Sequence, residues 1–126
     1  HTFTDAYTYE EGRREMTRLL KGEPAEAYFG GDDVLSLGAL SAIADAGLSV
    51  PGDIGIIGLN DMSMARWEGF NLTTIRQPVR EIIESSIELV VAMLDEPERY
   101  PEARVFHCDL VERGTLRPVP GSGQGV

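Results

Sequence analysis

A buried strand that ends in polar side chains is the feature that most constrains how this chain folds. Residues 54–59 carry no polar side chain, whereas a strand with one face in water alternates apolar and polar residues. Such a run is typical of a parallel strand that helices cover on both faces. Asn60 and Asp61 follow it directly. Because ligands of open parallel sheets bind beyond the carboxyl ends of the strands, these two residues are candidates for a binding site.

Three segments of the chain have the pattern of helices. A capping-box sequence, Thr-x-x-Glu, predicts a helix over 9–20. Asp32 or Asp33 can cap a second helix, and Gly47 suits the left-handed residue that follows a helix. Apolar residues recur at helical spacing over 78–94, which predicts a third helix.

Short strands are expected between and around these helices. Besides 54–59 they are a loose alternation over 1–5, then 25–29, 72–76 and 104–111. Strands that alternate with helices predict an α/β fold with a three-layer parallel sheet. The residues that follow the strands then share one edge of the sheet, and they are Tyr7, Asp32, Asp33, Asn60, Asp61 and Gln77. The sequence therefore predicts a polar cluster with one aromatic ring at this edge.

Length and composition indicate one globular domain. The chain has 126 residues, of which 42% are hydrophobic, enough for one core. No apolar run approaches the roughly 18 residues that cross a bilayer, and the polar N-terminus does not read as a signal peptide. The single cysteine, Cys108, excludes an internal disulfide framework and fits a reducing compartment. We therefore expect a cytoplasmic protein that has no membrane partner.

The charge of the chain argues against direct binding to nucleic acid. Its 21 acidic and 11 basic residues leave a formal net charge of -10. Binding a polyanion requires clustered basic side chains that release counterions. Arg13, Arg14 and Arg18 form the only local basic group, and three glutamates share its predicted helix. We expect no contact between this chain itself and DNA.

Signatures of enzymes and metal sites are missing from the sequence. No Ser-His-Asp order, zinc spacing or phosphate-binding loop occurs, and the two glycines Gly55 and Gly58 lie inside a strand rather than in a dinucleotide fingerprint. His107 and Cys108 are adjacent on a predicted strand, so they point to opposite faces. We therefore expect no catalytic residue, no metal and no cofactor.

Several motifs match, in order, those of one known family. The chain resembles the C-terminal part of the effector-binding domain of LacI-type bacterial transcriptional regulators, which share the type I periplasmic sugar-binding fold. Residues 31–39 look like the family's Asn-Asp-x-x-Ala-x-Gly helix start. The other matching segments are Val50-Pro51-Gly52-Asp53, Gly58-Leu59-Asn60-Asp61, Leu72-Thr73-Thr74-Ile75-Arg76-Gln77-Pro78 and Arg113-Gly114-Thr115-Leu116-Arg117-Pro118. The ordered set spans nearly the whole chain and is highly specific.

The resemblance implies that four residues contact a small-molecule effector, namely Tyr7, Asp32, Asn60 and Gln77. An aromatic face complements the C–H face of a sugar, while carboxylates and amides bond to hydroxyls. Two positions depart from the family, because Asp32 stands where Asn is common and Asn60 where Asp is usual. Asp32 and Asp33 can also serve only as helix caps, Asn60 and Asp61 only as a turn, and Tyr7 only as a hydrophobic staple.

The resemblance also implies a domain organisation. Residues 1–117 correspond to the C-terminal portion of the effector-binding and dimerisation domain, N-terminally truncated, and 118–126 to a disordered tail. In the family, the segment like 77–117 crosses back to a first lobe, which does not precede His1 here, and neither does a helix-turn-helix. The apolar stripe of the helix over 78–94 must then repack within the chain or against another copy.

A homodimer is implied as well. In the family, a helix like the one that begins near Asp33 packs across a two-fold axis, which makes Leu37, Met64 and Trp67 candidates for a dimer interface. The alternative is that these apolar side chains pack within their own domain.

Three functions are compatible with the sequence. The first is an effector sensor, not an enzyme, that binds a sugar, polyol or nucleobase-like ligand and allosterically controls DNA binding by a helix-turn-helix absent from this chain. The second is a solute-binding protein of a sugar transporter, which has the same fold. The third is a magnesium or phosphoacceptor domain built on Asp32, Asp33 and Asp61, although the only lysine, Lys21, closes the first helix instead of a strand.

Overall fold

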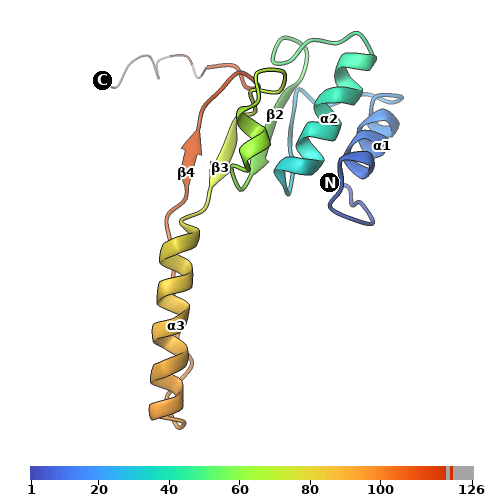
Figure 1. The fold of residues 1–126 in the computed structure, drawn as a ribbon. Coiled ribbons are helices and arrows are strands. Elements are labelled where there is room, and N and C mark those ends of the chain that lie inside the picture. Colours follow the sequence, from blue (N-terminus) through green and yellow to red (C-terminus); the bar gives the residue numbers. More distant parts are fainter. Residues whose placement is uncertain (119, 121–126) are drawn as a thin grey trace.

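The computed structural model describes residues 1–118 and 120, in which helices and strands alternate (Figure 1). The helical elements are α1 (Tyr9–Leu19), α2 (Asp33–Asp45), the 3-10 helix η1 (Ser63–Arg66) and α3 (Val79–Asp95). The strands are β1 (Ala27–Phe29), β2 (Gly55–Leu59), β3 (Thr74–Arg76) and β4 (Asp109–Val111). The three predicted helices are confirmed. Apart from Pro118 and Pro120, the tail expected over 118–126 lies outside the described residues.

The strands form one sheet in the order β1-β2-β3-β4. β1, β2 and β3 are parallel, which confirms the α/β class with a mostly parallel sheet. The strand expected over 104–111 is shorter and runs antiparallel to β3, because the chain returns from α3 without a crossover. The strand expected over 1–5 is wrong. Thr2 and Asp5 instead donate hydrogen bonds to carboxylates of α1.

Local capping explains where the first two helices begin and end. The Thr8 hydroxyl accepts the Glu11 amide at 3.2 Å, and the Asp32 carboxylate accepts the Val34 amide at 2.7 Å. α2 ends in a Schellman motif, in which Gly47, at a φ of 75°, donates to Ala44 and the next residue donates to Ile43. The expected position of Gly47 after the helix is therefore confirmed.

Two glycines allow α1 and α2 to approach each other very closely. A Cβ atom at Gly12 would overlap the carbonyl group of Leu35, and one at Gly38 would overlap the carbonyl oxygen of Tyr9. α2 packs in turn on β2, where a Cβ at Gly58 would meet the Asp33 carboxylate. The core between these elements contains mainly aliphatic side chains, including Met16, Leu37, Leu40, Ile43, Ile54, Ile56 and Leu72.

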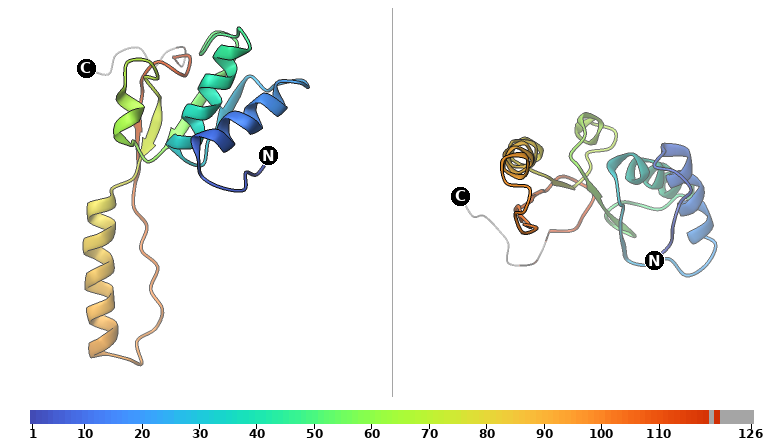
Figure 2. Two further views of the ribbon diagram at one scale, coloured as in Figure 1. Left: turned by 45° about the vertical axis from the view of Figure 1, so that its right-hand side comes forward. Right: turned by 90° about the horizontal axis from the view of Figure 1, so that it is seen from below.

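The other face of β1 and β2 carries less cover than the unbroken apolar run predicted. Within the described residues, Phe29 is 58% exposed and Ile57 is half-buried, whereas Ile56 on the α2 face is 1% exposed. Only part of this face is filled by the C-terminal segment, whose Leu116 side chain lies beside Gly55. A second helical layer does not form here because α3, the remaining long helix, points away from the sheet (Figure 2).

α3 projects from the sheet as an arm, and the chain after it runs back alongside (Figures 1 and 2). Arg104 on the returning segment bonds to the Ser85 carbonyl and hydroxyl at 3.1 and 2.8 Å. None of the α3 residues is buried, and its apolar stripe is more than half exposed at Val79, Ile83, Ile87, Val90, Val91 and Leu94. The stripe therefore does not repack within the chain. No helix in residues 1–118 is long and apolar enough to cross a membrane.

Candidate functional site

Three of the four predicted effector residues form a continuous chain of hydrogen bonds. The Gln77 amide nitrogen donates to Asn60 Oδ1 at 2.6 Å, and Asn60 Nδ2 donates to Asp32 Oδ2 at 2.9 Å. These residues follow β3, β2 and β1 respectively, so the chain runs across the carboxyl ends of three parallel strands. Asn60 is exposed, while Asp32 and Gln77 are partly exposed. The predicted cluster of polar groups at this edge is therefore present.

The backbone holds these side chains in register. The Gly30 amide donates to the Ile57 carbonyl, and the Asn60 amide donates to the Ile75 carbonyl, each at 2.8 Å, so the parallel ladder continues past the strand ends. Asn60 has a φ of 107°, a conformation that glycine adopts readily and other residues only under strain. Strained backbone at a cluster of exposed polar groups is more frequent at functional sites than elsewhere.

Tyr7 lies near this chain of hydrogen bonds but is not part of it. Tyr7 is 70% exposed, and a carbon of its ring lies 3.6 Å from where a Cβ at Gly31 would stand. No strand end delivers Tyr7; it precedes the helix cap, in a bend. Tyr7 also lines a groove of about 320 Å³ between the N-terminal segment and β1, together with Phe3, Phe29 and Gly31. The aromatic ring therefore lies beside Gly31, the residue that precedes Asp32.

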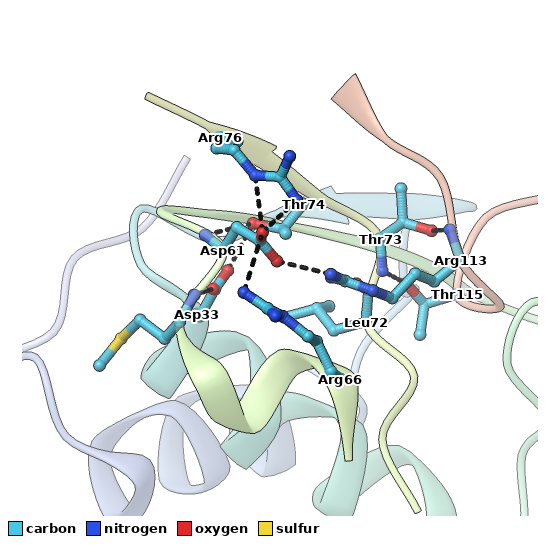
Figure 3. Close-up of polar contacts among 10 residues, drawn as sticks. Asp33, Asp61, Arg66, Leu72, Thr73, Thr74, Arg76, Arg113 and Thr115 are labelled. Atoms are coloured by element: carbon cyan, nitrogen blue, oxygen red, sulfur yellow. Dashed lines mark hydrogen bonds and ion pairs between the residues drawn. The ribbon is translucent and has the colours of Figure 1, made fainter. Parts of the chain in front are cut away.

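Asp33 performs a structural task directly beside the site. Its side chain is fully buried and accepts hydrogen bonds from the Thr74 hydroxyl and the Met62 amide, each at 2.6 Å (Figure 3). Burial raises the pKa of this carboxyl, and the two hydrogen bonds only partly oppose that effect. Asp33 thus ties α2 to β3 and to the turn after β2.

Asp33→Asn is expected to remove a pH dependence of stability. A raised folded-state pKa means that the free energy of unfolding falls as the pH rises from about 3.9, the unfolded value, to the folded pKa. An asparagine can accept from Met62 and donate to the Thr74 oxygen, so the variant should still fold. Urea titrations at several pH values would follow the difference in free energy of unfolding between Asp33→Asn and the wild type, which should change in favour of the variant as the pH rises through this range.

Asp61 is the centre of an arginine cluster rather than a free carboxylate. Its side chain is 2% exposed, and Arg76 donates to Oδ2 from Nε and Nη2 at 2.8 and 2.7 Å, while Arg113 donates to Oδ1 at 2.6 Å (Figure 3). Arg66 Nη2 lies 3.8 Å from Asp61 Oδ2. Burial alone would raise the pKa of Asp61, but the hydrogen bonds from Arg113 and Arg76 outweigh it and hold that pKa below its usual value.

The same cluster attaches the C-terminal segment to the sheet. Arg113 also donates to the Leu72 carbonyl at 2.8 Å, and the Thr115 hydroxyl donates to the Ile56 carbonyl at 2.6 Å while accepting the Thr73 amide at 2.9 Å. Sequence reasoning missed the arginines of this cluster. The one signal available was an aspartate directly after a buried strand, which predicts an ion pair as readily as a ligand site.

The arrangement offers no evident place for a metal ion. In the part of the chain that the structure describes, no three His, Cys, Asp or Glu side chains are grouped to hold one. Asp33 is occupied by Thr74 and Met62, and Asp61 by the arginines. The edge instead presents a carboxylate, two amides and an aromatic ring.

The three residues expected at a dimer interface have different surroundings. Leu37 is 3% exposed and belongs to the core of the chain itself. Met64 is half-buried, and Trp67 is 58% exposed with its ring 6.5 Å from that of Phe70. The dimer interface stays a prediction, and its exposed part rests on Trp67 and Met64.

Comparison with known proteins places this geometry in a family. The family of periplasmic binding protein-like domains matches residues 2–116. The chain belongs to this family. The repressor CytR of Escherichia coli K12 is 35% identical to this periplasmic binding protein-like chain over 115 residues, which are 90% of the chain and 34% of CytR. The probable repressor ExuR of Bacillus subtilis is 31% identical over 112 residues, 88% of the chain and 34% of ExuR.

Solved structures agree with this assignment. A LacI family transcriptional regulator from Enterococcus faecalis V583, solved with bound ribose, is 26% identical and superposes with a TM-score of 0.77. The match covers 93% of this periplasmic binding protein-like chain and 43% of that regulator. The resemblance to LacI-type regulators and the fold class are therefore confirmed. The chain spans about a third of the length of the curated relatives named above.

Proposed function

We propose that this chain is the effector-sensing part of a LacI-type transcriptional regulator. The observation that carries the proposal is the hydrogen-bonded chain Asp32–Asn60–Gln77 across three strand ends, with Tyr7 beside it. A sugar-like or other small polar ligand would bind there between this lobe and a second one. Binding would shift the population between two arrangements of the regulator and so control DNA binding through a helix-turn-helix elsewhere in the cytoplasmic, dimeric protein.

The chemistry of this edge suits a polyhydroxyl ligand. Hydroxyl groups both donate and accept, so they can bond to a carboxylate and to amides at the same time. The Tyr7 ring can pack on the apolar face of a sugar or base. The ribose in the Enterococcus faecalis regulator supports a ligand of this type.

The two other functions have less support. A solute-binding protein for transport has the same fold, but the curated relatives CytR and ExuR are transcriptional repressors. A magnesium or phosphoacceptor site needs free carboxylates, whereas two arginines neutralise Asp61 and Asp33 is fully engaged in hydrogen bonds.

Substitution of Asn60 should separate effector binding from folding. In the full-length regulator, Asn60→Ala and Asn60→Gly both remove the central amide, so we expect the thermal shift produced by the ligand to be lost. The glycine variant should unfold at or above the wild-type temperature, because a φ of 107° suits glycine and relieves a strain of about 1–3 kcal/mol. The alanine variant should unfold at a lower temperature than the wild type, because alanine keeps the strained φ and loses the hydrogen bonds of the amide.

The measurement is a thermal shift series with D-ribose, ribitol and adenine. A ligand at 100 times its Kd adds about 2.7 kcal/mol to the free energy of unfolding. Asn71→Gly is the matched control, because Asn71 also has a positive φ but precedes β3, at the opposite end of the strand from Gln77, and it should keep the response. A wild-type regulator that responds to none of the three compounds would contradict the proposed function.

A further inference from the structure

We propose that Asp32 is a positioning residue. It determines which side chain donates and which accepts along the hydrogen-bonded chain Asp32–Asn60–Gln77 at the carboxyl ends of the strands. Its consequence for effector binding rests on the proposed function, whereas the order of donors and acceptors follows from hydrogen bonds within the chain. Asp32 lies at one end of the hydrogen-bonded chain, and among the described residues it shares no hydrogen bond with Gln77 at the other end.

Asp32 is held in place independently of any ligand. As the N-cap of α2 it has extended backbone, and its Oδ1 accepts the Val34 amide at 2.7 Å. Its carbonyl oxygen accepts both the amide and the hydroxyl of Ser36, at 3.1 and 2.9 Å. One carboxylate oxygen is thereby committed to the helix, which leaves Oδ2 to face Asn60.

The Asp32 carboxylate then determines how the side-chain amides of Asn60 and Gln77 are oriented. A carboxylate only accepts hydrogen bonds, so Asn60 must turn its NH₂ group toward Asp32. The carbonyl oxygen of Asn60 is then on the other side, and Gln77 must donate to it. Within the described residues, the Gln77 side-chain oxygen accepts no hydrogen bond. The two ends of the edge therefore both present acceptors, and the ligand they match carries O–H or N–H donors at two separate points.

An isosteric change at Asp32 should reverse this direction. In Asp32→Asn the side-chain oxygen keeps the Val34 amide, so the group facing Asn60 becomes an NH₂ donor. Asn60 must then present its oxygen to residue 32 and its NH₂ to Gln77, which must accept. The Gln77 NH₂ group then loses its hydrogen bond, although the substituted side chain is linked to it only through Asn60.

The test measures the side-chain amides directly, with no effector present. The full-length regulator is labelled with ¹⁵N in Asn and Gln side chains, and hydrogen exchange of each NH₂ group is followed by NMR. In the wild type, the Gln77 NH₂ should be protected from exchange. In Asp32→Asn that protection should be lost while the Asn60 NH₂ stays protected. In Asp45→Asn, which removes the same charge from the exposed side of α2, both should stay as in the wild type.

Two further variants and one titration complete the test. In the Asn60→Gly background, adding Asp32→Asn should leave Gln77 unchanged, because the link between them is gone. Unchanged protection of Gln77 in Asp32→Asn, or the same loss in Asp45→Asn, would overturn the inference. D-ribose binding, measured separately by calorimetry, should weaken about tenfold, the effect of one lost hydrogen bond, in Asp32→Asn and not in Asp45→Asn. If the amide reversal occurs but the wild type binds none of the ligands in the thermal shift series, the proposed function fails and the positioning role stands.

Discussion

Asp61→Ala is expected to lower the free energy of unfolding by about 3–5 kcal/mol, the usual effect of removing one partner from a buried ion pair. The Arg113 side chain is only 12% exposed, and Asp61 is its one carboxylate partner among the described residues. Without Asp61, the Arg113 guanidinium stays buried, and its remaining hydrogen-bond partner among the described residues is the backbone carbonyl of Leu72. The C-terminal segment, which includes the edge strand β4, should then pack less tightly on the sheet. Urea denaturation followed by fluorescence of Trp67, the only tryptophan, would measure the change.

The controls separate burial from charge. Asp5→Ala removes a carboxylate that is 95% exposed, 3.4 Å from Arg14, and should change stability little. Because the pKa of Asp61 is lowered in the folded state, its contribution is present above the unfolded pKa of about 3.9 and is lost as the pH falls through the folded value. The difference between wild type and Asp61→Ala should therefore shrink in acid. A loss no larger than that of Asp5→Ala would contradict the buried ion pair.

Gly38→Ala is expected to cost about 1–3 kcal/mol, although alanine is the better helix former. A Cβ at this position would overlap backbone atoms of Tyr9 and Arg13, which cannot move aside as a flexible side chain can. α1 must then shift away from α2, and the shift should increase the separation between Tyr7, which precedes α1, and Asp32, which caps α2. Thermal unfolding and effector affinity of the same variant would test both consequences.

Gly69→Ala is the matched control for this substitution. A Cβ at Gly69 meets no atom within 4 Å, so the same chemical change should be tolerated. If the two variants unfold at the same temperature, the close approach of α1 and α2 does not limit stability.

The parts of the fold that local chemistry determines were predictable from the sequence. The apolar run over 54–59 predicted β2, the Thr8 and Asp32 caps predicted two helix starts, and Gly47 predicted a helix end. The meeting of Asp32, Asn60 and Gln77 followed from parallel strands, because such strands place their ends at one edge.

The remaining features depend on contacts between distant residues, for which the sequence holds no local signal. Arg76 and Arg113 lie far from Asp61 along the chain, and nothing in either neighbourhood indicates which carboxylate each will bind. The antiparallel direction of β4 depends on where α3 points, and the amphipathic pattern of α3 predicts a helix but not its partner. Tyr7 was expected after a strand that does not form, although it still lies beside Gly31.

The arm formed by α3 leaves the sheet and rejoins it at a single place. β3 ends at Arg76, which is paired with Asp109 at the start of β4, so the outgoing and returning strands are adjacent. The arm is therefore connected to the sheet through two adjacent strands, and Gln77 is the first residue after β3. Gln77 donates to Asn60 without a ligand, so a ligand that bonds to both residues would further restrict the angle between the arm and the sheet. If the effector binds at this edge as proposed, its binding would restrict the direction of α3, a helix that extends beyond the site (Figure 1).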